Sequence, residues 1–308
     1  MFQKQAVETI HLSAQLTDGE AANHKGMQMD ESHADLWIKD KTVEVFVDGQ
    51  LLLVHVAKAI DSHTHQEAYP DLRKVAKNKP TRAEATGLSQ QPTVRQDGSL
   101  SKTKRIDRNH PSLEFARDGN MGAFEDTLNK AAYCRKNKTE VYTLPAVANY
   151  IRAVDDVYKL YAPEHYARQL AAAREIRPEW SIVGAISTTT VNWCFNTRCH
   201  RDRSDYKFGM GAITCWYLGQ ENPVWTIFPQ SRVAVLIRPG DLLLSDVGNQ
   251  WHANSLPQRV PGYGTTNGRL AAIFYLRPGL LKCGSAETEA LRRETYWAAV
   301  KAKKAARQ

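Results

Sequence analysis

Short apolar stretches rich in β-branched residues, separated by glycine and proline turns, dominate the second half of the chain. After Trp180 they occupy residues 182–195, 211–218, 225–228, 232–237, 242–244 and 271–276. Runs of this length between turn formers are typical of β-strands. Many short strands in succession predict a jelly-roll barrel, that is, a double-stranded β-helix.

A helical period precedes these strands. Between about 145 and 177, apolar residues recur at intervals of three and four, and Pro163 marks the start of a second helix with Glu164 in its first turn. An apolar stripe of this kind is expected to pack against a sheet. The tail from about residue 286 is also predicted to be a helix, docked through Leu291, Tyr296, Trp297 and Val300, with its lysines facing out.

The first half is less regular. Residues 42–47 and 51–56 flank an Asp48-Gly49 turn, which predicts a β-hairpin packed on the main body. The stretch that contains His63 and His65 is expected to be a polar surface loop rather than a metal site. Residues 66–118 are polar, basic and without clear period, so loops are expected there. They are either ordered by a bound partner or a flexible surface insertion.

The whole chain is therefore expected to be an α+β protein with a jelly-roll core, flanking helices and an N-terminal β-hairpin region. We divide it into an N-terminal hairpin and basic loop region at 1–140, a core of helices and barrel at 141–285, and a basic helix at 286–308.

Composition indicates an intracellular protein without a membrane anchor. No run of about 18 apolar residues is present, and no apolar stretch follows the first charged residues as it would in a signal peptide. The five cysteines include no C-x-x-C pair, which is typical of reduced thiols. We expect the nucleus or cytoplasm of a microbial or virus-infected cell rather than secretion.

Charge favours an anionic partner. The formal net charge is +8, with ten Lys/Arg against four Asp/Glu in residues 71–110 and six against one in residues 291–308. Clustered positive charge is typical of nucleic-acid binding, although solvated charge that serves only solubility gives the same counts.

The most specific pattern lies between Arg198 and Arg269. In a β-strand, residues i and i+2 point to the same face, so His200 and Asp202 can project into one site. With His252 they form the two-histidine, one-carboxylate set of non-haem Fe(II) oxygenases. Ordinary loop histidines, or a cupin-like metal site without oxidation, are the alternatives. Arg269 follows His252 by 17 residues and offers a rigid fork for a carboxylate.

The segment from Cys199 to Tyr275 resembles the catalytic core of Fe(II)/2-oxoglutarate dioxygenases. Within that superfamily it is most similar to the TET/JBP group, which oxidises the 5-methyl group of pyrimidines in nucleic acid. Three motifs carry the resemblance, which covers roughly residues 180–280: His-Arg-Asp at 200–202, Arg-Pro-Gly-Asp-Leu-Leu-Leu-Ser-Asp with the later Trp-His-Ala-Asn, and the closing strand from Arg269 to Tyr275.

The resemblance assigns roles to individual residues. His200, Asp202 and His252 would hold Fe(II), and Arg269 would hold 2-oxoglutarate, which is decarboxylated to succinate and CO₂ in the presence of O₂. Tyr275 matches the aromatic residue that stacks on a base extruded from the duplex.

Two positions depart from the TET pattern. Asp205 stands where those enzymes carry an asparagine that touches the base, and an aspartate there can accept from the exocyclic amine of cytosine. Arg277 replaces a base-contacting histidine.

The expected function is hydroxylation of a pyrimidine 5-methyl group in DNA. Conversion of 5-methylcytosine to 5-hydroxymethylcytosine is favoured. The alternatives are thymine hydroxylation to 5-hydroxymethyluracil, an RNA or protein hydroxylase, or a catalytically silent jelly-roll module that binds nucleic acid.

Overall fold

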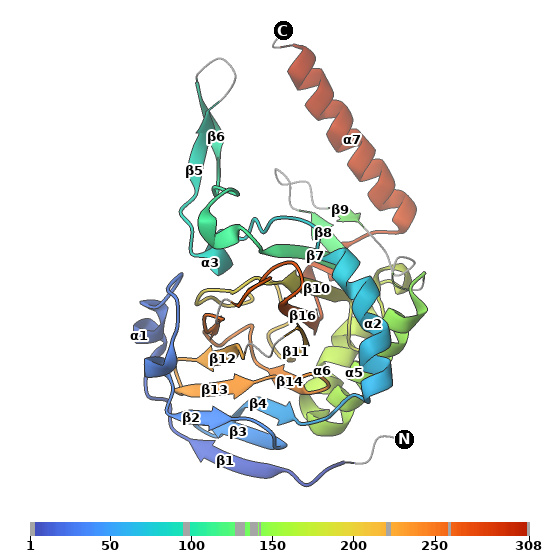
Figure 1. The fold of residues 1–308 in the computed structure, drawn as a ribbon. Helices are drawn as coiled ribbons and strands as arrows, with labels where there is room; N and C mark the ends of the chain where they lie inside the picture. The colour runs from blue at the N-terminus through green and yellow to red at the C-terminus, as the bar shows by residue number, and fades with distance from the viewer. Residues whose placement is uncertain are drawn as a thin grey trace.

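Two β-sheets packed against each other form the centre of the protein in the computed structural model, which describes residues 4–94, 99–126, 133–135, 141, 143–219, 223–257 and 260–306 (Figure 1). The strands are β1 Glu8–Leu12, β2 Leu36–Ile38, β3 Val43–Val47, β4 Gln50–Val56, β5 Gln91–Val94, β6 Leu100–Arg105, β7 Arg117–Gly122, β8 Phe124–Asp126, β9 Tyr133–Arg135, β10 Thr188–Trp193, β11 Gly211–Leu218, β12 Trp225–Phe228, β13 Val233–Leu236, β14 Leu242–Ser245, β15 Ala253–Asn254 and β16 Gly268–Tyr275. The helices are α1 Asp18–Ala22, α2 Ser62–Val75, α3 Ala83–Thr86, α5 Pro145–Tyr161, α6 Pro163–Glu175 and α7 Ala286–Ala305, with short 3₁₀ turns at Glu31–His33, Pro111–Leu113, Pro178–Trp180 and Pro278–Lys282.

The larger sheet has the strand order β1-β3-β4-β14-β11-β16-β10-β7, and the smaller one has the order β15-β12-β13-β2. The predicted strands of the second half are all present, and they fold into the jelly-roll core expected from their spacing. Their β-branched and aromatic residues suit the pleated surfaces of antiparallel pairs.

Apolar side chains fill the space between the two sheets. Val45, Leu53 and Leu243 of the larger sheet pack with Phe228 and Val235 of the smaller one, and all five are buried. A second apolar layer lies on the other face of the larger sheet, where Ile151, Val154 and Tyr158 of α5 meet Leu270 and Phe274 of β16.

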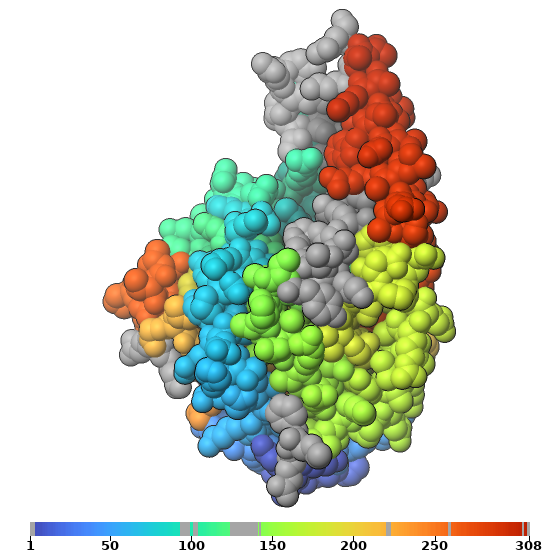
Figure 2. Space-filling model, turned by 90° about the vertical axis from the view of Figure 1, so that its right-hand side faces the viewer, coloured from blue at the N-terminus to red at the C-terminus, as the bar shows by residue number. Residues whose placement is uncertain are grey.

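Helices α2, α5 and α6 cover that outer face side by side (Figure 2). The two helices predicted between 145 and 177 are confirmed, and each has a proline in its first turn. Proline suits this position because the first backbone N–H groups of a helix have no partner within it.

The N-terminal half is more ordered than its sequence indicated. The predicted hairpin is confirmed as β3–β4, and β4 continues the larger sheet by pairing with β14. The loop expected around His63 and His65 is wrong, because these residues lie in the first turn of α2, whose N-cap Asp61 accepts from the backbone of Thr64 at 2.9 Å.

The expectation of loops throughout 66–118 is also wrong: the segment contains most of α2, together with α3, the β5–β6 hairpin and the start of β7. Only His65, Ala68 and Leu72 of α2 are buried, so its apolar stripe is too sparse to reveal a helical period.

The C-terminal helix is confirmed as α7. The docking expected of it is wrong for Leu291 and Trp297, whereas Tyr296 and Val300 are half-buried. Leu291 is 64% exposed and Trp297 is 42% exposed. The helix extends from the same end of the barrel as the β5–β6 hairpin (Figure 1).

The cysteines differ in part from expectation. Cys194, Cys199 and Cys215 are buried free thiols, whereas Cys283 is disulfide-bonded, so the prediction of five reduced thiols is wrong for that residue. Spacing along the sequence gave no sign of this pairing. Among the helices in the described part of the chain, none has the length and apolar character to cross a membrane.

Candidate active site

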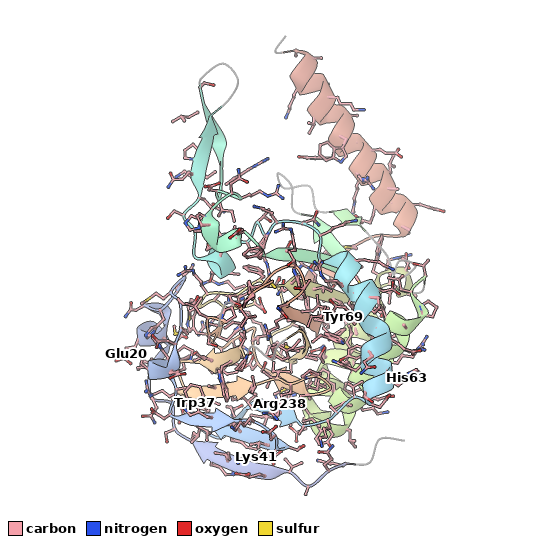
Figure 3. The ribbon with its side chains drawn as sticks, in the orientation of Figure 1. Glu20, Trp37, Lys41, His63, Tyr69 and Arg238 are labelled. Carbon is pink, nitrogen blue, oxygen red and sulfur yellow. The ribbon has the colours of Figure 1, made fainter. Side chains whose placement is uncertain are left out.

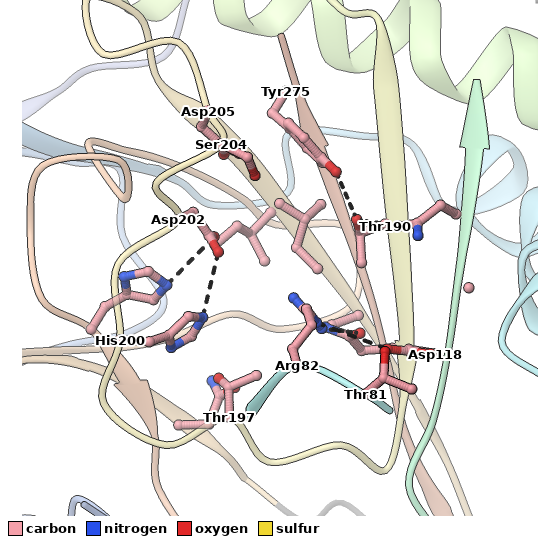
Figure 4. A pocket seen from close by; sticks show the side chains of 18 of the residues that line it. Thr81, Arg82, Asp118, Thr190, Thr197, His200, Asp202, Ser204, Asp205 and Tyr275 are labelled. Carbon is pink, nitrogen blue, oxygen red and sulfur yellow. Dashed lines mark hydrogen bonds and ion pairs between the residues drawn. The ribbon is translucent and has the colours of Figure 1, made fainter. Parts of the chain in front are cut away.

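A cavity of about 490 Å³ opens between the sheets at the side of β7, β10 and β16. The two-residue period of a strand determines its lining. Along β16, Arg269, Ala271, Ile273 and Tyr275 line the cavity, while the alternate residues belong to the apolar layer under the helices. The side chains that surround the cavity are drawn in Figure 4.

His200, Asp202 and His252 lie together on one wall. His200 and His252 form a two-residue antiparallel bridge, with each backbone N–H donating to the other's carbonyl at 3.0 Å. The Nε2 atom of His200 lies 3.5 Å from one oxygen of Asp202, and the Nε2 atom of His252 lies 3.7 Å from the other. One possible ligand atom from each of the three residues therefore lies within 4.8 Å of the other two.

The hydrogen bonds of both histidines leave the same nitrogen free. His200 Nδ1 lies 2.7 Å from the carbonyl of Arg198, and His252 Nδ1 lies 3.2 Å from the carbonyl of Gln250. A proton on Nδ1 satisfies these contacts and turns the Nε2 lone pair toward Asp202, as in metal sites where a backbone carbonyl orients the histidine. Two imidazoles and one carboxylate suit Fe(II).

Electrostatics favour the forms that bind metal. Burial, with the neighbouring His200 as the next cause, lowers the pKa of His252 to about 4, so this imidazole is neutral near pH 7. Burial alone would raise the pKa of Asp202. The contacts of Asp202 with His200 and His252 outweigh burial, and they hold the pKa of that carboxyl well below its usual range.

Arg269 lines the cavity as a buried cation, and it has no carboxylate partner in the described part of the chain. It is 7% exposed, its Nη2 donates to Cys215 Sγ at 2.8 Å, and its Nε has no hydrogen-bond partner. Burial works against its charge, whereas Cys215 and Tyr217 favour it, and the net effect raises its pKa. A buried guanidinium needs an anion, and the fork of Arg269 fits a carboxylate such as that of 2-oxoglutarate.

Asp205 also lines the cavity. Its backbone N–H donates to the carbonyl of Asp202 at 3.0 Å, its side chain is 6% exposed, and its Oδ2 atom has no partner. Burial, followed by the charge of Asp202, raises the pKa of Asp205, while Arg277 and Arg82 partly oppose this rise. The unpartnered oxygen of this buried carboxyl is therefore available to a polar group that enters the cavity.

Tyr275 lies beside this carboxyl. Its hydroxyl lies 3.0 Å from Thr190 Oγ1, which in turn donates to Asn120 Oδ1 at 2.7 Å. The ring of Tyr275 is thereby fixed in orientation against the cavity, which Arg277 also lines two residues later. The structure thus brings together all seven site residues expected from the sequence.

Sequence reasoning missed Arg82, which reaches the same cavity from the loop before α3. It donates to Asn192 Oδ1 at 3.0 Å, lies 3.8 Å from the carboxylate of Asp118, and covers the ring of Phe195 at 5.2 Å (Figure 4). Its charge lowers the pKa of both Asp202 and His252. The only sequence signal was the surplus of basic residues around it.

The chain is similar in sequence to proteins named as thymine dioxygenases. It is 31% identical over 140 residues to the bifunctional helicase and thymine dioxygenase JBP2 of Trypanosoma brucei brucei, and 33% identical over 138 residues to the thymine dioxygenase JBP1 of Crithidia fasciculata. The matches cover 45% and 44% of this chain but only 12% and 16% of those proteins. No family model matches the chain.

One solved structure supports the fold. NgTET1 in complex with 5mC DNA superposes with a TM-score of 0.50 over 85% of this chain and 90% of that one, at 11% sequence identity. At that identity the likeness concerns the arrangement of strands and helices, which is the jelly roll described above.

Proposed function

We propose that this chain, a member of the TET/JBP family of Fe(II)/2-oxoglutarate dioxygenases, hydroxylates the 5-methyl group of a pyrimidine in DNA inside the cell. The observation that carries the proposal is one cavity that combines three elements. These are a metal-ligand set, the buried cation Arg269 with no acidic partner among the described residues, and a fixed aromatic ring at Tyr275.

The chain's own groups divide the work. His200, Asp202 and His252 would hold Fe(II), and Arg269 would bind the distal carboxylate of 2-oxoglutarate. Together with 2-oxoglutarate and O₂, the metal supplies the oxidising chemistry that replaces one methyl hydrogen by hydroxyl. The protein's contribution is to position the methyl group and to exclude water from the cavity.

Base recognition would fall to the other wall. The ring of Tyr275 offers a stacking face for an extruded base, which offsets part of the cost of removing it from the duplex. Asp205 and Arg277 lie where they can meet the polar edge of that base. An ionised Asp205 accepts from the amine of 5-methylcytosine, our first candidate.

Thymine is the second candidate. The relatives at about a third identity are named thymine dioxygenases, and a protonated Asp205 donates to the O4 atom of thymine. Arg277 offers donors to the acceptors of either base.

Nucleoside mass spectrometry tests the proposal. Duplex DNA that carries both 5-methylcytosine and thymine is incubated with the protein, Fe(II), 2-oxoglutarate and ascorbate, and succinate is measured in parallel. 5-Hydroxymethylcytosine identifies the first candidate and 5-hydroxymethyluracil the second. Succinate without an oxidised base would exclude DNA and direct the search to RNA or protein, and no succinate would leave a silent binding module.

A matched pair of variants controls the assay. His200→Ala removes one metal ligand and should abolish succinate formation, because two ligands hold Fe(II) poorly. His63→Ala removes a histidine whose side chain is 80% exposed at the outer surface of α2 (Figure 3), and it should keep the parental rate. Equal rates in the two variants would refute the metal assignment.

A further inference from the structure

Two cations that line the cavity have no side-chain partner within the described part of the chain. Lys79 and Arg108 both line the cavity, and neither makes a hydrogen bond or ion pair from its side chain within the described part of the chain. Arg108 is exposed and lies near enough to Asp118 to oppose the rise in that carboxyl's pKa, which burial causes. The closer partner of Asp118 is Arg82, at 3.8 Å.

Two basic side chains of the surrounding elements are engaged in ion pairs. Lys74 pairs with Asp71 at 2.9 Å, and Lys25 pairs with Glu84 at 3.5 Å. Lys79 and Arg108, which line the cavity, have no such pair within the described part of the chain.

The unused charge continues away from the cavity along the β5–β6 hairpin. Arg105 pairs with Gln91 at the base of the hairpin, Lys104 is the next residue toward its tip, and both side chains are exposed. Arg108 follows Arg105 by three residues, which connects the hairpin to the cavity mouth. At about 3.3 Å per residue, β6 spans roughly 20 Å, the length of about six base pairs of duplex.

We propose that Lys79, Arg108, Arg105 and Lys104 form a phosphate track that holds the DNA backbone on the hairpin side of the extruded nucleotide. The inference rests on the proposed function and extends it: the substrate is a polynucleotide held by its phosphates, not a free nucleoside. Cations at the mouth would bind the phosphates next to the extruded nucleotide, while those on the hairpin would fix the direction in which the duplex leaves the site. Such contacts position a duplex without reading its sequence.

Salt dependence of binding measures this directly. Each phosphate contact contributes about 0.9 to the slope of log K against log salt concentration for B-DNA. The double variant Lys79→Gln/Arg108→Gln should lower the slope by about 1.8 and weaken binding roughly 60-fold at 0.1 M salt. Binding is followed by fluorescence anisotropy of a labelled duplex with the full chain, without iron, and a thermal melt verifies folding.

The control removes the same charge from the opposite end of the molecule. Lys39→Gln/Lys58→Gln neutralises two exposed lysines beside β2 and β4, and it should leave the slope unchanged (Figure 1). Because Lys79 is half-buried, Lys104→Gln/Arg105→Gln serves as a second test on fully exposed residues, with the same expected fall.

Three results would overturn the track: an unchanged slope in both hairpin-side variants, an equal fall in the control, or no salt-dependent DNA binding by the parental protein. The first two leave the proposed function intact if the parental protein still oxidises DNA. The third, combined with an absence of oxidised bases, would remove DNA as the substrate as well.

Discussion

Replacing Arg269 by methionine should weaken 2-oxoglutarate binding and, at the same time, stabilise the ligand-free protein. The guanidinium is buried, its Nη2 donates to Cys215 Sγ, Tyr217 also favours its charge, and its Nε has no hydrogen-bond partner among the described residues. An unpaired buried charge costs several kcal/mol of desolvation free energy. Methionine fills a similar volume without that cost, so the free energy of unfolding should rise in the absence of ligand.

The loss of affinity follows from the hydrogen bonds of the fork. One bond to a charged group contributes about 1.5–3 kcal/mol, so losing a single arm raises Kd by roughly 10- to 150-fold, and losing both raises it further. At a concentration of 100 times the parental Kd, 2-oxoglutarate stabilises the parental protein by about 2.7 kcal/mol. For a chain of 308 residues, the unfolding entropy is about 650 cal/mol/K, which converts this gain into a Tm shift of about 4 °C.

Thermal melts with and without 2-oxoglutarate, with Mn(II) in place of Fe(II) to prevent turnover, compare the two proteins. In Arg269→Met a 100-fold rise in Kd leaves about 0.4 kcal/mol of stabilisation, a shift below 1 °C. The control is Arg232→Met, which breaks an exposed ion pair with Asp35 and should retain the full ligand shift. If 2-oxoglutarate raised the Tm of Arg269→Met as much as it raises the Tm of the parental protein, Arg269 would not bind the ligand's carboxylate. If Arg269→Met without ligand melted at a lower temperature than the parental protein, the argument that Arg269 is an unpaired buried charge would be wrong.

Three further predictions concern other groups. Burial lowers the pKa of His65 from 6.5 to about 4, so its contribution to stability is complete above pH 6.5 and falls as the pH drops toward 4. Between pH 7 and 5, urea unfolding should lose about 2 kcal/mol less stability in His65→Phe than in the parental protein, whereas His63→Gln should lose as much as the parental protein. Tyr275→Ala should lower kcat/KM on DNA by roughly 5- to 150-fold through lost stacking, whereas Tyr275→Phe, which keeps the ring and loses the hydroxyl contacts to Thr190 and Arg277, should stay within about tenfold; equal losses would exclude stacking. Asp205→Ala should change the ratio of kcat/KM between 5-methylcytosine and thymine DNA by about 1–3 kcal/mol, or 5- to 150-fold, and a ratio within twofold of the parental one would remove Asp205 from base reading.

The parts that the sequence predicted well depend on local spacing. The barrel strands are short apolar runs that end at glycine or proline turns, which is why β11 to β14 and β16 could be located within a few residues. The two-residue period of a strand predicted that His200 and Asp202 would share a face. His252 required only that a later strand return beside them, and the structure has it directly opposite His200.

The parts that it missed depend on long-range contacts. Helix α2 buries His65 against Trp216, with ring centroids 4.3 Å apart, and against Tyr150, whose hydroxyl lies 3.0 Å from His65 Nδ1. A search for regularly spaced apolar residues does not detect a histidine that is buried in the core. The β5–β6 hairpin was missed for a related reason: its sequence shows no alternation of apolar and polar residues.

Arg82 is a residue of the candidate site that was missed for the same reason. It is separated from Asn192 by 110 residues, yet it donates to that side chain and affects the pKa values of the metal-ligand set. Lys79, Arg108 and Asp118 join the cavity from the same N-terminal half, where the sequence resembles no family that we could identify. On the proposed function, the metal ligands and the candidate base contacts lie in the recognisable segment of 180–280, while Arg82, Lys79, Arg108 and Asp118 line the same cavity from outside it. It follows that substrate choice can diverge between relatives that share the metal motif, and that the identity of the base must be measured on this chain.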